Sequence, residues 1–234
     1  RIWQIVVWIT KALKLKLCGQ SWHLNKLYMK NVIGIGSALV DILTRIDNDD
    51  ILKELEIRKG SMHLVDEKST AIIENRLENY ESSMAPGGSA ANTIHALSKM
   101  GIESGFISFI GKDEIGKFFE NSMSSVGVKS YLFHTDTASG TARTIISADG
   151  ERTFATNLGA SLELNERVIT ADIFKQWDYC YVEGYLIANK NLFKKVIHTA
   201  KECGCKVILD LASYNVVEDN RDFLKELLPQ IDIV

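Results

Sequence analysis

The sequence predicts an α/β protein with a central, mostly parallel sheet that is flanked by helices and carries a small β-lid. Short apolar runs alternate with segments of helical periodicity along most of the chain, a pattern typical of consecutive βαβ units. Two β-rich stretches interrupt this alternation. The 234 residues contain only 2 prolines and no Ser/Gly-rich stretch, so we expect one folding unit without a flexible linker.

The predicted elements begin with a buried strand over residues 32–35, where the apolar run Val-Ile-Gly-Ile is followed by Gly36. Capping residues support the helices, because Asp113 can cap the start of one helix and Gly127 can end it in a left-handed conformation. Gly101 and Gly204 are placed to end two other helices in the same way. The helices are expected at 66–80, 89–100, 113–126, 191–203 and 219–228, and the further strands of the main sheet at 106–110, 179–182 and 207–209.

The two stretches that break the alternation are residues 40–46 and 140–156. The second is typical of a β-hairpin, because Asp149-Gly150 is a strong turn signal. We expect these strands to leave the main sheet and form the lid. Residues 231–234 resemble the start of a further strand, and a parallel strand needs a crossover helix after it, so the architecture is expected to be incomplete at the C-terminus.

The first 28 residues differ in composition from the rest of the chain. They contain three of the 4 tryptophans and carry a net charge of +5, which leaves −8 for the remainder of a chain whose total is −3. We expect an atypical extension outside the fold, with the folded part starting at Met29. The alternative is a basic helix on an anionic membrane surface. The apolar run 2–9 is too short to span a bilayer, which needs about 20 residues, so no membrane partner is expected.

Charge and cysteine usage exclude other classes of partner. An acidic body lacks the concentrated basic face that nucleic-acid binding needs, so no nucleic-acid partner is expected. The cysteines show no C-x-x-C spacing, which predicts reduced thiols and a cytoplasmic protein. The histidines are scattered without the spacing of metal ligands, so no metal site is expected. The four cysteines are Cys18, Cys180, Cys203 and Cys205.

The segment most informative about chemistry contains Gly87 and Gly88 in front of a predicted helix that begins at Ser89. Glycines let the backbone approach a ligand closely, and the first amides of a helix are free to donate to oxygen atoms. Asn92, one turn later, offers both a donor and an acceptor to a polyol. This pattern predicts a hydroxyl-binding helix start; a tight turn with a surface asparagine is the alternative.

A second candidate is Asp41, which lies just past the first strand, where ligands usually bind in α/β sheets. A carboxylate among apolar neighbours needs partners, and ligand hydroxyls would supply them. The alternative is a turn or capping role. A Rossmann dinucleotide site is not indicated, because Gly34 and Gly36 are followed by Leu39 where the fingerprint needs Gly or Ala.

Together these residues resemble the ribokinase-like (PfkB) carbohydrate kinase family, from about Met29 to Val234. The resemblance implies a ribokinase-like fold in which residues 29–234 form the N-terminal, substrate-binding part of a kinase domain, including the lid. The matching motifs, in chain order, are Gly36 to Asp41, Gly87 to Asn92, Ile110-Gly111-Lys112-Asp113-Glu114-Ile115-Gly116, Gly127-Val128, and the hairpin from Ser139-Gly140-Thr141 to Arg152-Thr153-Phe154.

In that family the early Asp and the Gly and Asn of the helix start hold the substrate's hydroxyls. The resemblance therefore implies this role for Asp41, Gly88 and Asn92. The neighbouring residues Ser37, Gly87 and Ser89 are expected to complete the substrate-binding set.

Within the family, residues 152–160 are most similar to adenosine kinases. That similarity implies that Leu158 and Ala160 line a base pocket, that Tyr185 stacks on a purine, and that Arg152 approaches the reacting end. For Tyr185, a place in the core is the alternative. Ser37 departs from the pattern, because adenosine kinases tend to have Asn there.

The resemblance implies a kinase that transfers a phosphoryl group from ATP to the 5′-hydroxyl of a nucleoside, with adenosine as the first candidate and Mg²⁺ as the counter-ion of ATP. The alternatives are a sugar kinase acting on ribose, fructose or a keto-sugar acid, and a non-catalytic ligand-binding protein. No Gly-Ala-Gly-Asp motif occurs, so the catalytic base and anion hole are expected beyond Val234, and the 234 residues alone are expected to be inactive. Either a monomer or a lid-mediated homodimer is expected.

Overall fold

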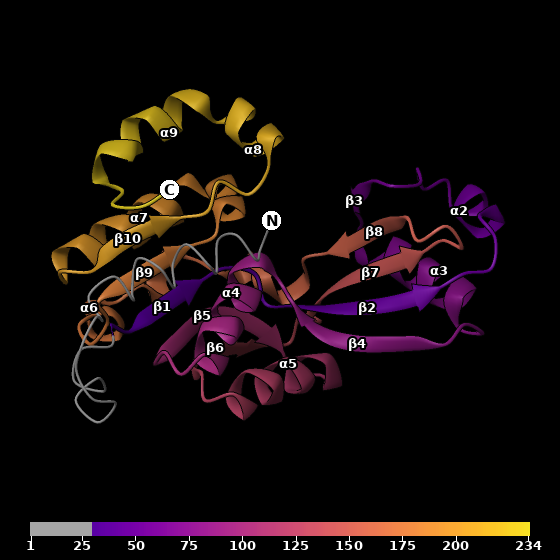
Figure 1. The fold of residues 1–234 in the computed structure, drawn as a ribbon, viewed down its shortest axis with the longest axis horizontal. Coiled ribbons are helices and arrows are strands. Elements are labelled where there is room, and N and C mark those ends of the chain that lie inside the picture. The colour runs from indigo at the N-terminus through magenta and orange to yellow at the C-terminus, as the bar shows by residue number, and fades with distance from the viewer. Residues whose placement is uncertain (1–29) are drawn as a thin grey trace, which may run out of the picture.

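The computed structural model describes residues 30–234 and contains two five-stranded sheets in this range. The predicted extension over residues 1–28 and Cys18 lie outside the described residues. Figure 1 shows the main sheet on the left and the second sheet extending away from it on the right. The predicted α/β architecture with a separate small sheet is therefore confirmed. We call the second sheet and its helices, residues 39–87 and 140–157, the lid.

The main sheet has the strand order β10-β9-β1-β5-β6, and all its paired strands are parallel. β1 lies in the centre and is buried along its whole length, as its continuous apolar run predicts. Residues 231–234 start a strand beside β10, through a parallel bridge between Ile208 and Ile233. The strands are β1 (Val32–Ile35), β5 (Ser104–Gly111), β6 (Lys129–Thr135), β9 (Tyr179–Val182) and β10 (Lys206–Leu209).

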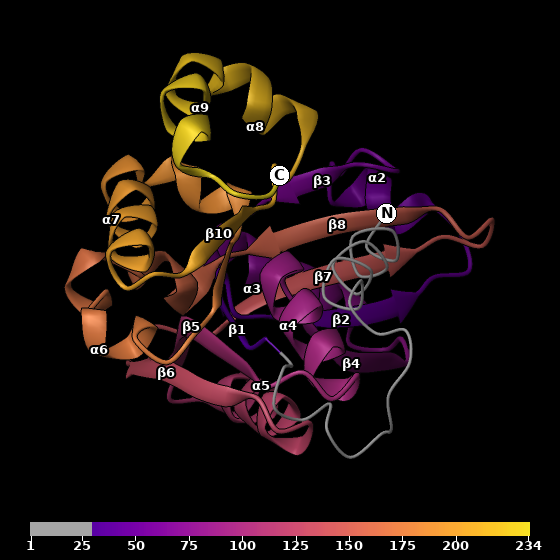
Figure 2. The same ribbon diagram turned by 60° about the vertical axis from the view of Figure 1, so that its left-hand side comes forward.

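Helices cover both faces of the main sheet, as Figures 1 and 2 show. Alternate residues of β1 face opposite sides, so Val32 packs with one set of helices and Ile33 with the other. A Cβ atom on Gly34 would lie 2.4 Å from Ile94, which is why α4 can pack directly on β1. The first face carries α4 (Ser89–Lys99) and α5 (Glu114–Ser125), and the second carries α6 (Ala171–Phe174), α7 (Lys190–Glu202) and α9 (Arg221–Leu227).

The lid sheet has the strand order β3-β8-β7-β2-β4. The predicted hairpin turn is present: Gly150 has a φ of 87°, and Ser147 N–H donates to Glu151 O at 2.9 Å. Two helices pack on one face of the lid around Ile73 and Ile145. The lid consists of β2 (Leu39–Arg45), α2 (Asp50–Glu54), β3 (Met62–Leu64), α3 (Glu67–Leu77), β4 (Ser82–Gly87), β7 (Gly140–Ile146) and β8 (Arg152–Asn157).

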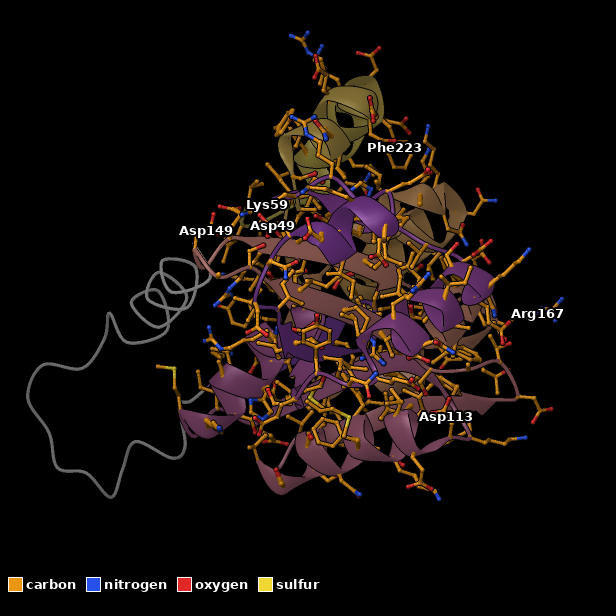
Figure 3. All side chains as sticks on the ribbon, turned by 90° about the vertical axis from the view of Figure 1, so that its right-hand side faces the viewer. Asp49, Lys59, Asp113, Asp149, Arg167 and Phe223 are labelled. Carbon is orange, nitrogen blue, oxygen red and sulfur yellow. The ribbon has the colours of Figure 1, made fainter. Side chains whose placement is uncertain are left out.

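An ion cluster holds the end of the lid that lies farthest from the main sheet. Lys59 Nζ lies 2.7 Å from a carboxylate oxygen of Asp49 and 2.7 Å from one of Asp149. Figure 3 shows the three side chains together at the tip of the lid. The cluster joins the loop before β3 to the hairpin between β7 and β8.

Several elements were not predicted from the sequence. β3, β4, β6 and α2 lacked a clear periodic signal, and β4 contains Pro86, which only an edge strand tolerates. The helix predicted over 219–228 is interrupted at Asn220, so that α8 (Tyr214–Asp219) precedes α9. Short 3₁₀ segments complete the chain: η2 (Gly159–Glu163), η3 (Glu166–Val168), η4 (Gly184–Ala188) and η5 (Leu228–Gln230).

The chain passes between the main sheet and the lid at four places: residues 36–38, residue 88, residues 136–139 and residues 158–160, the last of which includes the start of η2. We call these the crossings. They bring the ends of β1 and β5, the start of α4 and the base of the lid together, and this junction contains most of the predicted site residues. None of the helices over residues 30–234 is long and apolar enough to span a membrane.

Candidate substrate-binding site

The start of α4 touches the first crossing so closely that only glycine fits. Gly88 has a φ of 90°, and a Cβ atom on it would lie 2.2 Å from the carbonyl oxygen of Ser37. The buried hydroxyl of Ser108 in β5 fixes the same crossing, because it donates to Gly36 O at 2.7 Å and accepts from Ala38 N–H at 3.0 Å. Ser37 and Gly88 are therefore held side by side.

Glu183, at the end of β9, is a site residue that the sequence analysis missed. Its carboxylate is 2% exposed and accepts from Ser37 N–H at 3.3 Å, Ala90 N–H at 3.1 Å and Ser89 Oγ–H at 3.2 Å. Burial raises the pKa of Glu183, and these hydrogen bonds partly offset that effect. Glu183 thus joins the first crossing to the first turn of α4. A polar residue directly after the apolar run 179–182 was the available signal.

Ser89 also contacts the end of β10. Its hydroxyl lies 3.2 Å from an Asp210 carboxylate oxygen, and the other Asp210 oxygen accepts from Ala212 N–H at 3.0 Å. Ala212 has a positive φ of 60°, which is uncommon for a residue other than glycine. The carboxyl ends of β1, β9 and β10 therefore converge on the start of α4, at the edge where parallel sheets bind ligands.

Asp41 lies in β2, in register with Ala85 on one side and Ala142 on the other. Its carboxylate occupies the space above Gly87, where a Cβ atom would be 2.3 Å from Asp41 Oδ1. Burial raises the pKa of Asp41 from 3.8 to about 6. A partly buried carboxylate that is destabilised by burial is one that hydrogen-bond donors can stabilise, and its place explains why residue 87 is glycine; the substrate-binding role of Asp41 stays a prediction.

The side chain of Asp41 shares one face of the lid sheet with several apolar residues, because directly paired residues point to the same side. This face is opposite the one that α2 and α3 cover. Met62 is 51% exposed on it and Leu64 67%. We call it the open face; by register its members include Asp41, Leu43, Met62, Leu64, Ala142, Thr144, Ile146, Arg152, Phe154 and Thr156.

A pocket of about 550 Å³ opens at the base of the lid, beside the open face. Leu158 and Leu64 both line it; Leu158 was predicted to line a base pocket, which stays a prediction, and Leu64 was not singled out in the sequence. Ala160 does not line it: this residue is fully buried, and its N–H donates to Ala138 O at 2.7 Å. The complete wall consists of Leu64, Val65, Asp66, Glu67, Thr137, Ala138, Thr156, Asn157, Leu158, Gly159 and Leu162.

The remaining predicted residues lie at different distances from this centre. Asn92 is partly exposed one turn into α4, and Tyr185 is 43% exposed in η4, directly after β9, so it is not a core aromatic. Arg152 is on the open face but not beside Asp41. Arg152 pairs with Ile146, which lies four residues along β7 from the residue paired with Asp41. At ~3.3 Å per residue, Arg152 and Asp41 are therefore about 13 Å apart along the strand direction.

Comparisons with known proteins agree with this geometry. The family described as "pfkB family carbohydrate kinase" matches residues 62–234. The chain belongs to the pfkB family of carbohydrate kinases. The ribokinase-like fold that the sequence predicts is thereby confirmed.

Individual relatives are distant. The chain is 25% identical over 210 residues to guanosine-inosine kinase of Escherichia coli (strain K12), covering 84% of this chain and 48% of the relative. It is 29% identical over 159 residues to ribokinase of Haemophilus influenzae, covering 67% and 49%. The crystal structure of adenosine kinase from Sinorhizobium meliloti matches with a TM-score of 0.75 and 27% identity, over 87% of this chain and 63% of that one. The chain therefore spans about half the length of the curated relatives.

Proposed function

We propose that the protein is the substrate-binding part of an ATP-dependent kinase that phosphorylates the 5′-hydroxyl of a purine nucleoside, with adenosine as the first candidate. The observation that carries the proposal is the placement of Asp41 and the pocket by the open face. Asp41 and Thr156 stand in one register row with β7 between them, so their strands are roughly 10 Å apart. A ribose joined to a base reaches both places, whereas a free sugar reaches one.

The proposed contacts follow from this placement. Asp41 accepts from ribose hydroxyls, the Gly88 backbone and Asn92 bind the same sugar from the start of α4, and Ser37 and Ser89 shape that end of the site. Leu64 and Leu158 contact the base. Tyr185 offers an exposed ring for stacking. Arg152 reaches the substrate only if the lid closes over it.

The chemistry of transfer is proposed to come from elsewhere in the complete protein. Over residues 30–234 no group of three or more His, Cys, Asp or Glu side chains could hold a metal ion, so no step is assigned here to Mg²⁺, which would arrive with ATP. We propose that the catalytic base and anion hole follow Val234. A cytosolic location also belongs to the proposal, and Cys180, Cys203 and Cys205 are free thiols.

A sugar kinase is the second candidate function, favoured by the similarity to a ribokinase. Asp41 and the start of α4 would bind a free pentose or hexose in the same way. The two candidates differ only in whether the pocket lined by Leu64 and Leu158 takes part in binding.

Calorimetric titration of the chain with adenosine, guanosine, ribose and fructose tests the proposal. Burial of about 60 Å² of a base in the apolar pocket supplies roughly 1.4 kcal/mol, so a nucleoside should bind at least about tenfold more tightly than ribose. Leu64→Ser should remove this advantage and leave ribose binding unchanged, because Leu64 is exposed and the fold does not depend on it. Asp41→Asn should weaken both ligands about tenfold or more. Equal binding of ribose and nucleosides by the wild type would support the sugar kinase instead.

A further inference from the structure

The N-cap residue of α5 does more than cap a helix. Asp113 Oδ1 accepts from Gly116 N–H at 2.7 Å, which is the ordinary capping bond. The same oxygen accepts from Ser139 Oγ–H at 2.7 Å, and Asp113 Oδ2 accepts from Ser139 N–H at 2.7 Å. Ser139 Oγ in turn accepts from Gly111 N–H at 2.8 Å. One carboxylate therefore binds a helix start and a second chain segment 26 residues away.

That second segment is the third crossing, because Ser139 is the last residue before β7 enters the lid. The surrounding backbone is packed without space for side chains. A Cβ atom on Gly111 would lie 2.6 Å from Thr137 O, and one on Gly116 would lie 2.3 Å from Gly111 O. Figure 3 shows Asp113 well apart from the Lys59 cluster, and the bonds to Ser139 and to Asp149 place the first group at the third crossing and the second at the hairpin.

The third crossing is bonded directly to the fourth. Ala160 N–H donates to Ala138 O at 2.7 Å, and Gly159 has a φ of 48°, with a Cβ position only 2.4 Å from the same carbonyl oxygen. Thr137 and Ala138 from the third crossing and Leu158 and Gly159 from the fourth are walls of the pocket. The Asp113 carboxylate therefore binds the pocket wall of the third crossing directly. It is linked to the wall of the fourth crossing through the hydrogen bond between Ala160 N–H and Ala138 O.

The ionisation of Asp113 fits this arrangement. Burial alone would raise its pKa, but the hydrogen bonds from Ser139 and Gly116 outweigh burial and keep the pKa below its usual value. An ionised carboxylate has acceptor capacity on both oxygens for all three donors, and such charge-assisted bonds are stronger than neutral ones.

We propose that Asp113 is a positioning residue for the nucleoside pocket: by binding the third crossing, and through it the fourth, its carboxylate sets the pocket walls that receive the base. The part of this inference that concerns the ligand rests on the proposed function. The part that concerns the crossings does not need a ligand.

Asp113→Asn separates the two tasks of the carboxylate. The amide oxygen can still accept from Gly116 N–H, and Asn is as good an N-cap as Asp, but the amide nitrogen now faces Ser139 N–H as a second donor. Hydrogen exchange measured by mass spectrometry should become about tenfold faster or more at the amides of Ser139 and Ala160. The affinity for adenosine should fall about tenfold or more, with ribose affinity nearly unchanged.

Two further variants make the result decisive. Ser139→Ala removes the bridging hydroxyl and leaves the cap of α5 intact, so it should also speed exchange at both crossings even if Asp113→Asn folds poorly. Asn189→Ala is the matched control: it removes the N-cap of α7, where Asn189 Oδ1 accepts from Leu192 N–H at 3.1 Å, and should lower stability without changing exchange at the crossings.

The proposal would be overturned if hydrogen exchange at positions 139 and 160 stayed at the wild-type rate in both Asp113→Asn and Ser139→Ala. It would also be overturned if the changes were confined to the first turn of α5, because Asp113 would then act only as a helix cap. Faster exchange with unchanged adenosine binding would overturn it as well, because the crossings would then not control the pocket. Absence of binding of both adenosine and guanosine by the wild type refutes the proposed function, and the exchange data then decide the role of Asp113 alone.

Discussion

Asp41→Asn should make the ligand-free protein more stable while it removes a substrate contact. The structure gives the magnitude, because burial raises the pKa of Asp41 from 3.8 to about 6. One pKa unit corresponds to about 1.36 kcal/mol, so the ionised carboxylate destabilises the fold by at most ~3 kcal/mol at neutral pH. Partial exposure to water reduces this value. We expect Asn to raise the free energy of unfolding at pH 7.5 by about 1–2 kcal/mol, or the Tm by roughly 2–8 °C.

The pH dependence provides the assay. A raised carboxyl pKa gives stability that is fully present below pH 3.8 and is lost as the pH rises through about 6. The difference in the free energy of unfolding between Asp41→Asn and the wild type should therefore be close to zero at pH 4 and grow to a plateau above pH 7. Urea unfolding of both proteins at several pH values measures this difference, and other titrating groups cancel in the comparison.

The control is Asp47→Asn, which removes an exposed carboxylate two residues after β2 and should leave stability unchanged. A turn or capping role for Asp41 predicts the opposite sign, a loss of about 0.5–2 kcal/mol on substitution. A destabilised Asp41→Asn, or a gain that does not vary with pH, would refute the reasoning from burial.

Two further predictions concern the start of α4 and the N-terminal residues. Gly88→Ala should destabilise the protein by about 1–3 kcal/mol or more in chemical unfolding, because φ is 90° and the new Cβ meets Ser37 O; Gly101→Ala, with φ 83° and open space, should lose only about 1–2 kcal/mol. Equal losses would show that the contact with Ser37 is unimportant. Deleting residues 1–28 should leave the Tm unchanged, and a fall of several degrees in differential scanning calorimetry would show that they pack on the fold.

The sequence predicted the elements whose signals are local. The strands at 32–35, 179–182 and 207–209 are continuous apolar runs because both faces of the main sheet are covered. The predicted cap Asp113 does bind the first turn of its helix. The edge strands β4 and β6 were missed because they are half exposed and mix polar with apolar residues, so pairing with a neighbour decides their conformation.

In the candidate site, too, the sequence pointed to residues with local signals and missed residues whose roles depend on distant segments. Gly87, Gly88 and Asp41 could be proposed from the sequence because glycines before a helix and an acid after a strand are visible in short segments. Glu183 and Leu64 were missed because their roles depend on contacts with segments about 90 or more residues away in the chain. The same limit applies to Ala160, whose burial follows from its bond to Ala138.

The pairing of β2 with β7 also has a consequence for biosynthesis. Leu39 pairs with Gly140, 101 residues later, so β2 cannot find this partner until β7 has been made. At about 5–20 residues per second, synthesis imposes a wait of roughly 5–20 s, during which β2 can pair with β4 but its other edge has no partner strand. A chaperone that shields this segment on the ribosome should raise the yield of folded protein more than one that acts after release, because the edge of β2 that β7 covers stays unpaired until β7 has emerged.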